Sequence, residues 1–385
     1  MIISGFTGYY SWISFFASVI LKNVTFLSKT IDLFKYLFFS IFLISILGLF
    51  FLFSASNGNF EIVSKQSAYV AIGLIIMMLI SQPDPDLFRR TSGLFLILAL
   101  ILMAITYMFG PEINGAQRWV RAGPFSFQSS ELLKLALPIF LANFLFNKKL
   151  PIQTKEIFIT LIIIFCTFLI VARQPDLGTG LIVALSGLFV LFLSGLSWSF
   201  IGGSFVLLVI SSPFAWNVLL QPFQRQRIAT FFNPESDPFG ASWNIIQSKI
   251  AIGSGGLFGK GFGEGSQTQL NFLPETETDF IFSVIGEEFG FAGVLLLLSI
   301  YLFILLRCFY LALSARDRFC RLVIGGISLT FAANLIINLC MVVGLLPVVG
   351  MPLPFVSKGG SSLISLFFAF GIIMSMGTHK KFLPQ

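Results

Sequence analysis

The sequence predicts an all-α polytopic membrane protein of about ten transmembrane helices, with a long extracellular loop between spans 7 and 8. Three observations support this fold class: the composition, the recurrence of long apolar stretches, and the distribution of basic residues. Hydrophobic residues make up 56% of the 385-residue chain and charged residues only 11%, whereas soluble domains carry about 25% charged residues. The composition therefore excludes an ordinary cytosolic protein.

Apolar stretches of about 17–25 residues, the length that spans a bilayer as a helix, recur along the chain. They lie at 36–54, 67–82, 92–109, 129–147, 156–172, 177–196, 198–217, 278–306, 320–344 and 354–377. We expect one transmembrane domain over 36–378, followed by a cytoplasmic tail, 379–385. Residues 1–35 are expected to be a cytoplasmic or interfacial extension, because the apolar stretch 9–21 is short for a span and lacks signal-peptide features.

The basic residues indicate how the chain crosses the membrane. Cytoplasmic loops are enriched in Lys and Arg, and a large group of basic residues near span ends falls on one side if the amino terminus is cytoplasmic. These residues are Lys22, Lys29, Lys35, Arg89, Arg90, Lys148, Lys149, Lys155, Arg307, Arg316, Arg318, Arg321, Lys380 and Lys381. Both termini are then cytoplasmic, and the connections 110–128, 173–176 and 218–277 lie outside.

The polar segment that enters the eighth span contains the most informative residue, Asp279. A carboxylate at the membrane surface can stay ionised and still be basic enough to act as a general base. The alternative is structural: 274–279 begins a helix, Thr278 caps it, and the acidic residues suit its positive end. Glu287 and Glu288, further into the span, either face a hydrated cavity or have a functional role.

Other charged residues lie near the predicted outer ends of spans. Glu131 and Lys134 are three residues apart and share a helix face, so they either form an internal ion pair or offer Lys134 to an anionic substrate. Arg118 and Trp119 precede that span, and Trp119 is typical of an interfacial anchor. Lys358 lies in an apolar region and needs an acidic partner or an anionic ligand.

Several kinds of site are not supported by the sequence. The glycine-rich run 253–265 lacks the Walker pattern, because Ser254 and Gly261 occupy two of its required positions. No nucleic-acid motif is present, the four cysteines show no metal spacing, and the single His379 lies in the tail. We expect no organic cofactor and no metal site built by the protein alone, although a divalent cation, Mg²⁺ or Mn²⁺, could be held by carboxylates and substrate phosphates.

From about residue 90 to about 378, the chain resembles the SEDS family (shape, elongation, division and sporulation), which includes the RodA and FtsW proteins. The motifs that carry the resemblance occur in order: NGAQRWVRAGPFSFQSSELLK, RQPDLGTG, QRQRIATFFNP, QSKIAIGSGGLFGKGFGEGSQTQLNFLPETETDFIF and PLPFVSKGGSSL. Its SQTQLNFLPE portion looks more like RodA than FtsW, which favours elongation over division.

The resemblance implies a peptidoglycan glycosyltransferase in the bacterial cytoplasmic membrane. Such enzymes polymerise lipid II, an undecaprenyl-pyrophosphate-linked precursor, at the outer face, together with a class B penicillin-binding protein of the elongation or division machinery. It places the essential aspartate at Asp279. The expected substrate-binding residues are Arg118, Trp119, Glu131, Lys134, Arg225, Arg227, Glu277, Ser357, Lys358 and Ser361.

The chain departs from the family pattern at two positions. Glu277 stands where a histidine is common, and Lys358 stands where a tyrosine is common. We expect these two residues to compensate each other by pairing. Two other functions fit the sequence: a flippase for lipid-linked precursors, since ionisable residues also line transport pathways, and a non-catalytic scaffold that positions the partner synthase.

Overall fold

The computed structural model describes most of the membrane domain. The described residues are 35–111, 117–122, 125–150, 152–174, 176–196, 200, 202–203, 210, 216, 222–232, 243–270 and 272–378. The predicted N-terminal extension, except Lys35, the cytoplasmic tail and nearly all of the predicted span 198–217 lie outside these residues.

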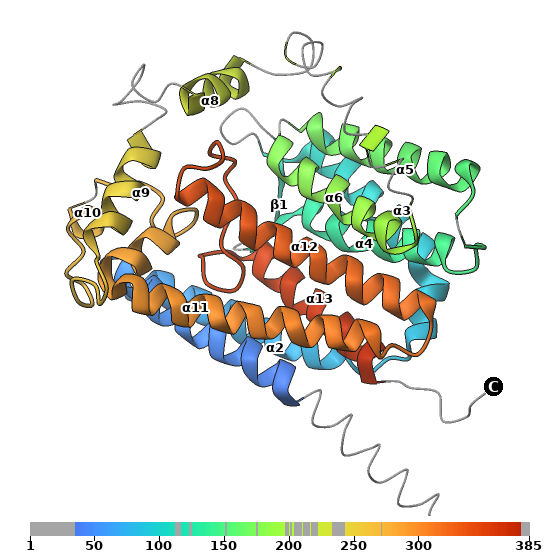
Figure 1. Ribbon diagram of the computed structural model, residues 1–385, viewed down its shortest axis with the longest axis horizontal. Coiled ribbons are helices and arrows are strands. Elements are labelled where there is room, and N and C mark those ends of the chain that lie inside the picture. The colour runs from blue at the N-terminus through green and yellow to red at the C-terminus, as the bar shows by residue number, and fades with distance from the viewer. Residues whose placement is uncertain are drawn as a thin grey trace, which may run out of the picture.

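The described elements are mainly long helices packed side by side (Figure 1). In chain order they are the helix Lys35–Ala55, α2 (Phe60–Ile80), α3 (Pro85–Phe109), β1 (Trp119–Ala122), β2 (Phe125–Gln128), α4 (Ser129–Leu145), α5 (Thr154–Ala172), α6 (Leu177–Leu193), α8 (Pro222–Phe232), α9 (Trp243–Ser254), α10 (Ser266–Gln269), α11 (Ile281–Leu313), α12 (Arg318–Val342) and α13 (Ser361–Thr378). Figure 1 shows α12 and α13 crossing the middle of the molecule, where α13 packs on α2 and α12 packs on α6 and α11.

Nine of the ten predicted spans coincide with described helices, and seven of these helices are long and apolar enough to cross a membrane. The shorter α6 is apolar as well. Helices dominate because, in hydrocarbon, they satisfy every backbone hydrogen bond within one segment. The multi-pass helical fold is thus confirmed, and the tenth span stays a prediction.

Two predicted boundaries differ from the structure. The outer connection 110–128 contains an antiparallel hairpin, in which Trp119 of β1 pairs with Gln128 of β2. The predicted last span begins at Ser361 and not at 354, because the stretch 343–360 is not helical. Pro352 and Pro354 lack the N–H that a helix needs, so this apolar stretch cannot continue as a regular helix.

The long connection 218–277 is partly helical. It contains α8, α9 and α10, and its glycine-rich part packs against α11. There α11 is interrupted at Gly290, whose backbone (φ 62°, ψ −160°) is not helical. The N–H groups of Lys260 and Gly261 donate to the carbonyls of Glu287 and Glu288 at 3.0 Å each, so the loop hydrogen-bonds the backbone around this break.

Basic residues tie several connections together at the opposite end of the bundle. Arg316 forms ion pairs with Asp84, Asp86 and Asp317, at 3.5, 3.0 and 3.4 Å. Arg318 donates hydrogen bonds to carbonyls in two other connections. These contacts fix the ends of α2, α3, α11 and α12. The cavity described below lies at the other end of the bundle.

Replacement of Gly259 by alanine should destabilise the protein more than replacement of Gly263. Both glycines have positive φ, 80° and 73°, so alanine strains the backbone by about 1–2 kcal/mol at either position. Only at Gly259 would the new methyl group also meet backbone, 2.0 Å from the Glu288 carbonyl oxygen. Melting temperatures in detergent should therefore fall by at least about 2–4 °C more for Gly259→Ala. Equal shifts would contradict a structural role for this contact.

Candidate functional site

A cavity of about 500 Å³ opens at the end of the bundle opposite to the Arg316 ion pairs. We call it the main cavity. Its walls come from α4, α6, α12, α13, the hairpin and two non-helical segments, 274–280 and 343–360. Seven of the eleven predicted site residues line it: Arg118, Trp119, Glu131, Lys134, Asp279, Ser357 and Lys358.

Asp279 lies in a tight turn that precedes α11. The N–H groups of Thr278, Asp279 and Phe280 all point at the carbonyl of Glu275, each at 3.2 Å, and Glu275 itself has a positive φ of 56°. The alternative of a Thr278 helix cap is wrong, because α11 begins at Ile281 without acidic residues in its first turn. The Asp279 side chain is half-buried on the cavity wall.

Asn338 of α12, which the sequence analysis missed, holds two parts of the site together. Its side-chain amide donates to the carbonyl of Asp279 at 3.0 Å and to the carbonyl of Met351 at 2.6 Å. The side chain is fully buried. An amide within an apolar span is the signal that could have revealed it, because polar groups at that depth need partners.

The segment 343–360 is non-helical backbone at membrane depth, and side chains from neighbouring helices satisfy its polar groups. Gln66 of α2 donates to the carbonyl of Ser357 and accepts from the N–H of Gly359, both at 3.2 Å. Tyr301 donates to the carbonyl of Pro354 at 2.5 Å. Such backbone is tolerated within a membrane only where protein buries it or where it lines a cavity, and this segment does both.

Glu277 and Lys358 form the ion pair expected from the two departures from the family pattern. Their side chains meet at 2.5 Å, and the N–H of Lys358 also donates to the carbonyl of Glu277 at 2.8 Å. The pairing prediction is confirmed. The contact joins the Asp279 turn to the segment 343–360, so it links two walls of the main cavity.

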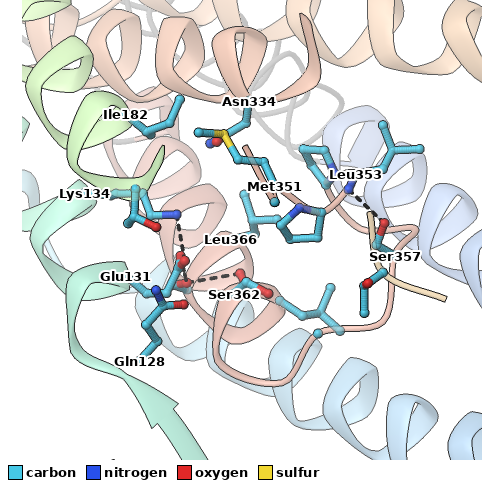
Figure 2. Close-up of a pocket in the computed structure, with 18 of the residues that line it drawn as sticks. Gln128, Glu131, Lys134, Ile182, Asn334, Met351, Leu353, Ser357, Ser362 and Leu366 are labelled. Atoms are coloured by element: carbon cyan, nitrogen blue, oxygen red, sulfur yellow. Dashed lines mark hydrogen bonds and ion pairs between the residues drawn. The ribbon is translucent and has the colours of Figure 1, made fainter. Parts of the chain in front are cut away.

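Glu131 and Lys134 form the internal ion pair that their spacing predicted, and the contact of Lys134 with an anionic substrate stays a prediction. Their side chains form an ion pair at 2.7 Å, and Ser365 donates to the second oxygen of Glu131 at 3.0 Å. Figure 2 shows Lys134 directed toward Glu131 on the cavity wall. Because both side chains are largely buried, the pair holds a cation in place beside any molecule that enters the cavity.

The hairpin and the start of α6 form another part of the wall. Arg118 donates to the carbonyl of Gln174 at 3.1 Å. Asp176 caps α6 by accepting from the N–H of Thr179 at 3.1 Å, and it also accepts from Gln128 at 2.9 Å.

The remaining predicted residues lie elsewhere. Arg225 and Arg227 belong to α8, which lies apart from α12 and α13 in Figure 1. Arg225 is not among the described residues that line the main cavity. The side chain of Arg227 lies outside the described part. Ser361 is buried at the start of α13 and does not line it. Glu277 does not line the cavity, but it forms an ion pair with Lys358, which does.

Glu287 and Glu288 face neither a hydrated space nor the main cavity. Both are buried, at 0% and 1% exposure. Glu287 pairs with Lys260 at 2.7 Å, and Glu288 accepts from Ser54 at 2.5 Å. The prediction of a hydrated helix face is wrong, because both carboxylates are buried: Lys260 of the glycine-rich loop pairs with Glu287, and Ser54 of the helix Lys35–Ala55 donates to Glu288.

The charges of the main cavity define what it can do chemically. Four carboxylates and three cationic side chains line it: Glu131, Asp176, Glu275, Asp279, Arg118, Lys134 and Lys358. Glu131 pairs with Lys134, Asp176 caps α6, and Glu275 accepts from Thr278. In the described part of the chain, no group of three His, Cys, Asp or Glu residues could hold a metal. The arrangement suits a proton acceptor that works beside cations which bind an anionic substrate.

The Glu277–Lys358 pair should contribute measurably to stability. We expect a coupling free energy of about 0.2–1 kcal/mol between Glu277→Gln and Lys358→Gln, because the Lys358 side chain is 43% exposed and exposed pairs are weak. A double-mutant cycle on the free energy of unfolding, measured by SDS titration in mixed micelles, gives this value. A matched cycle with the exposed Glu264→Gln in place of Glu277→Gln should be additive. Equal coupling in both cycles would contradict a specific pair.

Asn338→Leu should destabilise the protein more than Asn334→Leu, one turn earlier on α12. The first change leaves the carbonyls of Asp279 and Met351 without their donor, and each buried unsatisfied group costs about 1–3 kcal/mol. Asn334 lines the cavity, and none of the hydrogen bonds among the described residues involves its side chain. Unfolding titrations of both variants provide the comparison. A similar loss for the two would show that the Asn338 hydrogen bonds do not hold the site.

Comparisons with known proteins agree with this architecture. The chain is 46% identical over 334 residues to the peptidoglycan glycosyltransferase MrdB of Escherichia coli K12, covering 87% of this chain and 90% of that protein. It is 37% identical to a probable peptidoglycan glycosyltransferase FtsW of Trichlorobacter lovleyi, with 83% and 84% covered.

Two solved structures share the fold. One comes from work on the structural coordination of polymerization and crosslinking by a peptidoglycan synthase complex (TM-score 0.79, 30% identity, 89% of this chain and 97% of that chain). The other is the rod shape determining protein RodA of Thermus thermophilus (TM-score 0.68, 28% identity, 89% and 95%). The family model of the cell cycle proteins FtsW, RodA and SpoVE matches residues 34–382. The chain therefore belongs to the FtsW/RodA/SpoVE family of cell cycle proteins.

Proposed function

We propose that this protein is a peptidoglycan glycosyltransferase that polymerises lipid II into glycan strands during cell elongation, with Asp279 as its general base. The observation that carries the proposal is that Asp279 and three cationic side chains line one cavity. Relatives at 46% and 37% identity are named as peptidoglycan glycosyltransferases. The higher identity to MrdB and the RodA neighbour support elongation over division.

The proposed reaction requires a base and a cationic group that stabilises the negative charge of the leaving pyrophosphate. A sugar hydroxyl of the acceptor loses its proton to Asp279 as its oxygen bonds to the anomeric carbon of the donor sugar. The bond from that carbon to the lipid pyrophosphate breaks, and the pyrophosphate leaves with the electron pair. General-base catalysis contributes typically about 10²–10⁴-fold in rate.

Cationic side chains that line the main cavity suit the leaving group. Arg118 and Lys134 are positioned by the carbonyl of Gln174 and by Glu131, and we assign them to the pyrophosphate. Trp119, Ser357 and Lys358 are proposed to contact the substrate from the same cavity. A fixed cation acts on developing charge without having to reorganise during the reaction.

A divalent cation remains a proposal, and any Mg²⁺ or Mn²⁺ would bind mainly to substrate phosphates. The described residues form no cluster of three potential metal ligands, and Asp279 is the carboxylate we would expect to approach it. Mg²⁺ commonly binds proteins through one or two carboxylates together with phosphates, so a single carboxylate on the cavity wall fits that role. Such an ion would neutralise charge on the pyrophosphate.

The membrane orientation and the partner are also part of the proposal. The main cavity and the Arg316 ion pairs lie at opposite ends of the bundle. The tendency of basic loops to lie on the cytoplasmic side supports an orientation with the cavity at the outer face of the cytoplasmic membrane and both termini inside. The structure of a synthase complex that couples polymerization to crosslinking supports a class B penicillin-binding protein as partner.

Asp279→Asn should abolish glycan polymerisation while the protein stays folded. Labelled lipid II would be supplied to the purified protein together with its cognate penicillin-binding protein in a transpeptidase-dead form. We expect at least about a 10²-fold loss of rate for Asp279→Asn, because the amide cannot accept the proton. Glu264→Gln, which removes one exposed carboxylate of the outer loop, should leave the rate unchanged.

Gel filtration and the melting temperature establish that the Asp279→Asn variant is folded. Equal polymer from wild type and Asp279→Asn would show that Asp279 is structural. No polymer from the wild type, beside an active family member, would favour a flippase or a scaffold.

A further inference from the structure

Arg307 is a cation that the proposed reaction does not use. It lies on α11, and its guanidinium carbon lies 5.0, 5.9 and 6.0 Å from the ring centroids of Tyr36, Tyr310 and Phe303. Tyr36 belongs to the helix Lys35–Ala55, so the rings come from two neighbouring helices. Aromatic faces attract and orient a cation, but they do not neutralise its charge.

No carboxylate among the described residues pairs with Arg307. The acidic residues Asp84, Asp86 and Asp317 at this end of the bundle are engaged by Arg316. The Nε of Arg307 is buried and has no hydrogen-bond acceptor in the described part of the chain. A charged group within a transmembrane helix is unfavourable unless a partner or water compensates it, so an anion beside this guanidinium would stabilise it.

Arg307 lies near the end of α11. It precedes Leu313, the last residue of the helix, by six residues, which is about 9 Å along the helix axis. The long side chain of an arginine can extend its charged head from such a position toward the polar region of a bilayer, which is about 5–8 Å thick on each side. The neighbouring side chains Phe303, Leu306 and Leu313 are exposed apolar groups, as expected for a surface in contact with lipid.

The surroundings of Arg307 supply further donors for a phosphate. Lys35 is exposed and precedes Tyr36 directly in sequence. The hydroxyls of Tyr36 and Tyr310 have no hydrogen-bond partner among the described residues, and both rings are about half-exposed, at 53% and 49%. A guanidinium offers a planar set of donors that matches the oxygens of a phosphate. Basic pockets between helices on one side of a membrane bind anionic headgroups in this way.

We propose that Arg307, with Lys35, Tyr36 and Tyr310, binds the phosphate of an anionic membrane phospholipid. The site is distinct from the main cavity, because it lies at the opposite end of α11 from Asp279. The lipid would bridge the helix Lys35–Ala55 and α11. It would thus hold together two helices whose outer ends meet through Ser54 and Glu288.

Native mass spectrometry of the full chain tests the site directly. The wild type should retain phosphatidylglycerol at lower lipid concentrations than phosphatidylcholine. Arg307→Gln should weaken phosphatidylglycerol retention by about tenfold or more, because a charge-assisted hydrogen bond is lost. Arg321→Gln removes the same charge from an exposed residue at the same end of the bundle and should change retention by less than about twofold.

A second variant keeps the test decisive if Arg307→Gln does not fold. Tyr310→Phe preserves the ring beside Arg307 and removes only the hydroxyl, and it should weaken phosphatidylglycerol retention by about two- to tenfold. Equal retention of the two lipids by the wild type would overturn the proposal, as would equal losses for Arg307→Gln and Arg321→Gln. Displacement of the lipid by millimolar inorganic phosphate would overturn the assignment to a phospholipid.

Discussion

The need to hydrogen-bond non-helical backbone inside a membrane is the constraint on which this structure depends. Two such segments border the main cavity, the Asp279 turn and the stretch 343–360, and the side-chain amide of Asn338 donates to a carbonyl in each. Gln66 and Tyr301 satisfy further groups of the second segment. In lipid, an unsatisfied backbone group costs several kcal/mol, so these few polar side chains determine where the chain can leave helical geometry.

Charged side chains are under a similar constraint, because they need partners where they are buried. Glu287 pairs with Lys260 of the glycine-rich loop, and Glu277 pairs with Lys358 beside the cavity. Each pair joins segments that are distant in sequence, so a requirement of burial also fixes tertiary structure. For the buried Glu287, removing Lys260 would leave an uncompensated charge, which is far less favourable than the intact pair. The glycine-rich loop therefore has a structural role: it covers the interruption of α11 and shields its carboxylates.

The two ends of the bundle serve different purposes. At one end, ion pairs of Arg316 and hydrogen bonds of Arg318 fix the connections between helices. At the other end, irregular segments surround a cavity in which Asp279 lies with Arg118 and Lys134. A rigid bundle that carries a polar cavity at one face is suited to a membrane enzyme whose substrate has a lipid tail and a pyrophosphate, because the tail can stay in the bilayer while the reacting groups enter the cavity.

The sequence by itself determined the helical membrane fold and most members of the candidate site, since long apolar stretches have one stable solution in lipid and charges near them stand out. The Glu277–Lys358 pairing was also predictable, because two unusual residues of opposite charge each needed a partner. Only the tertiary structure decided that Asn338 anchors the site, that α13 begins at Ser361, and that Glu287 and Glu288 are covered by a loop. These features depend on contacts between residues far apart in sequence, and local patterns carry no information about such contacts.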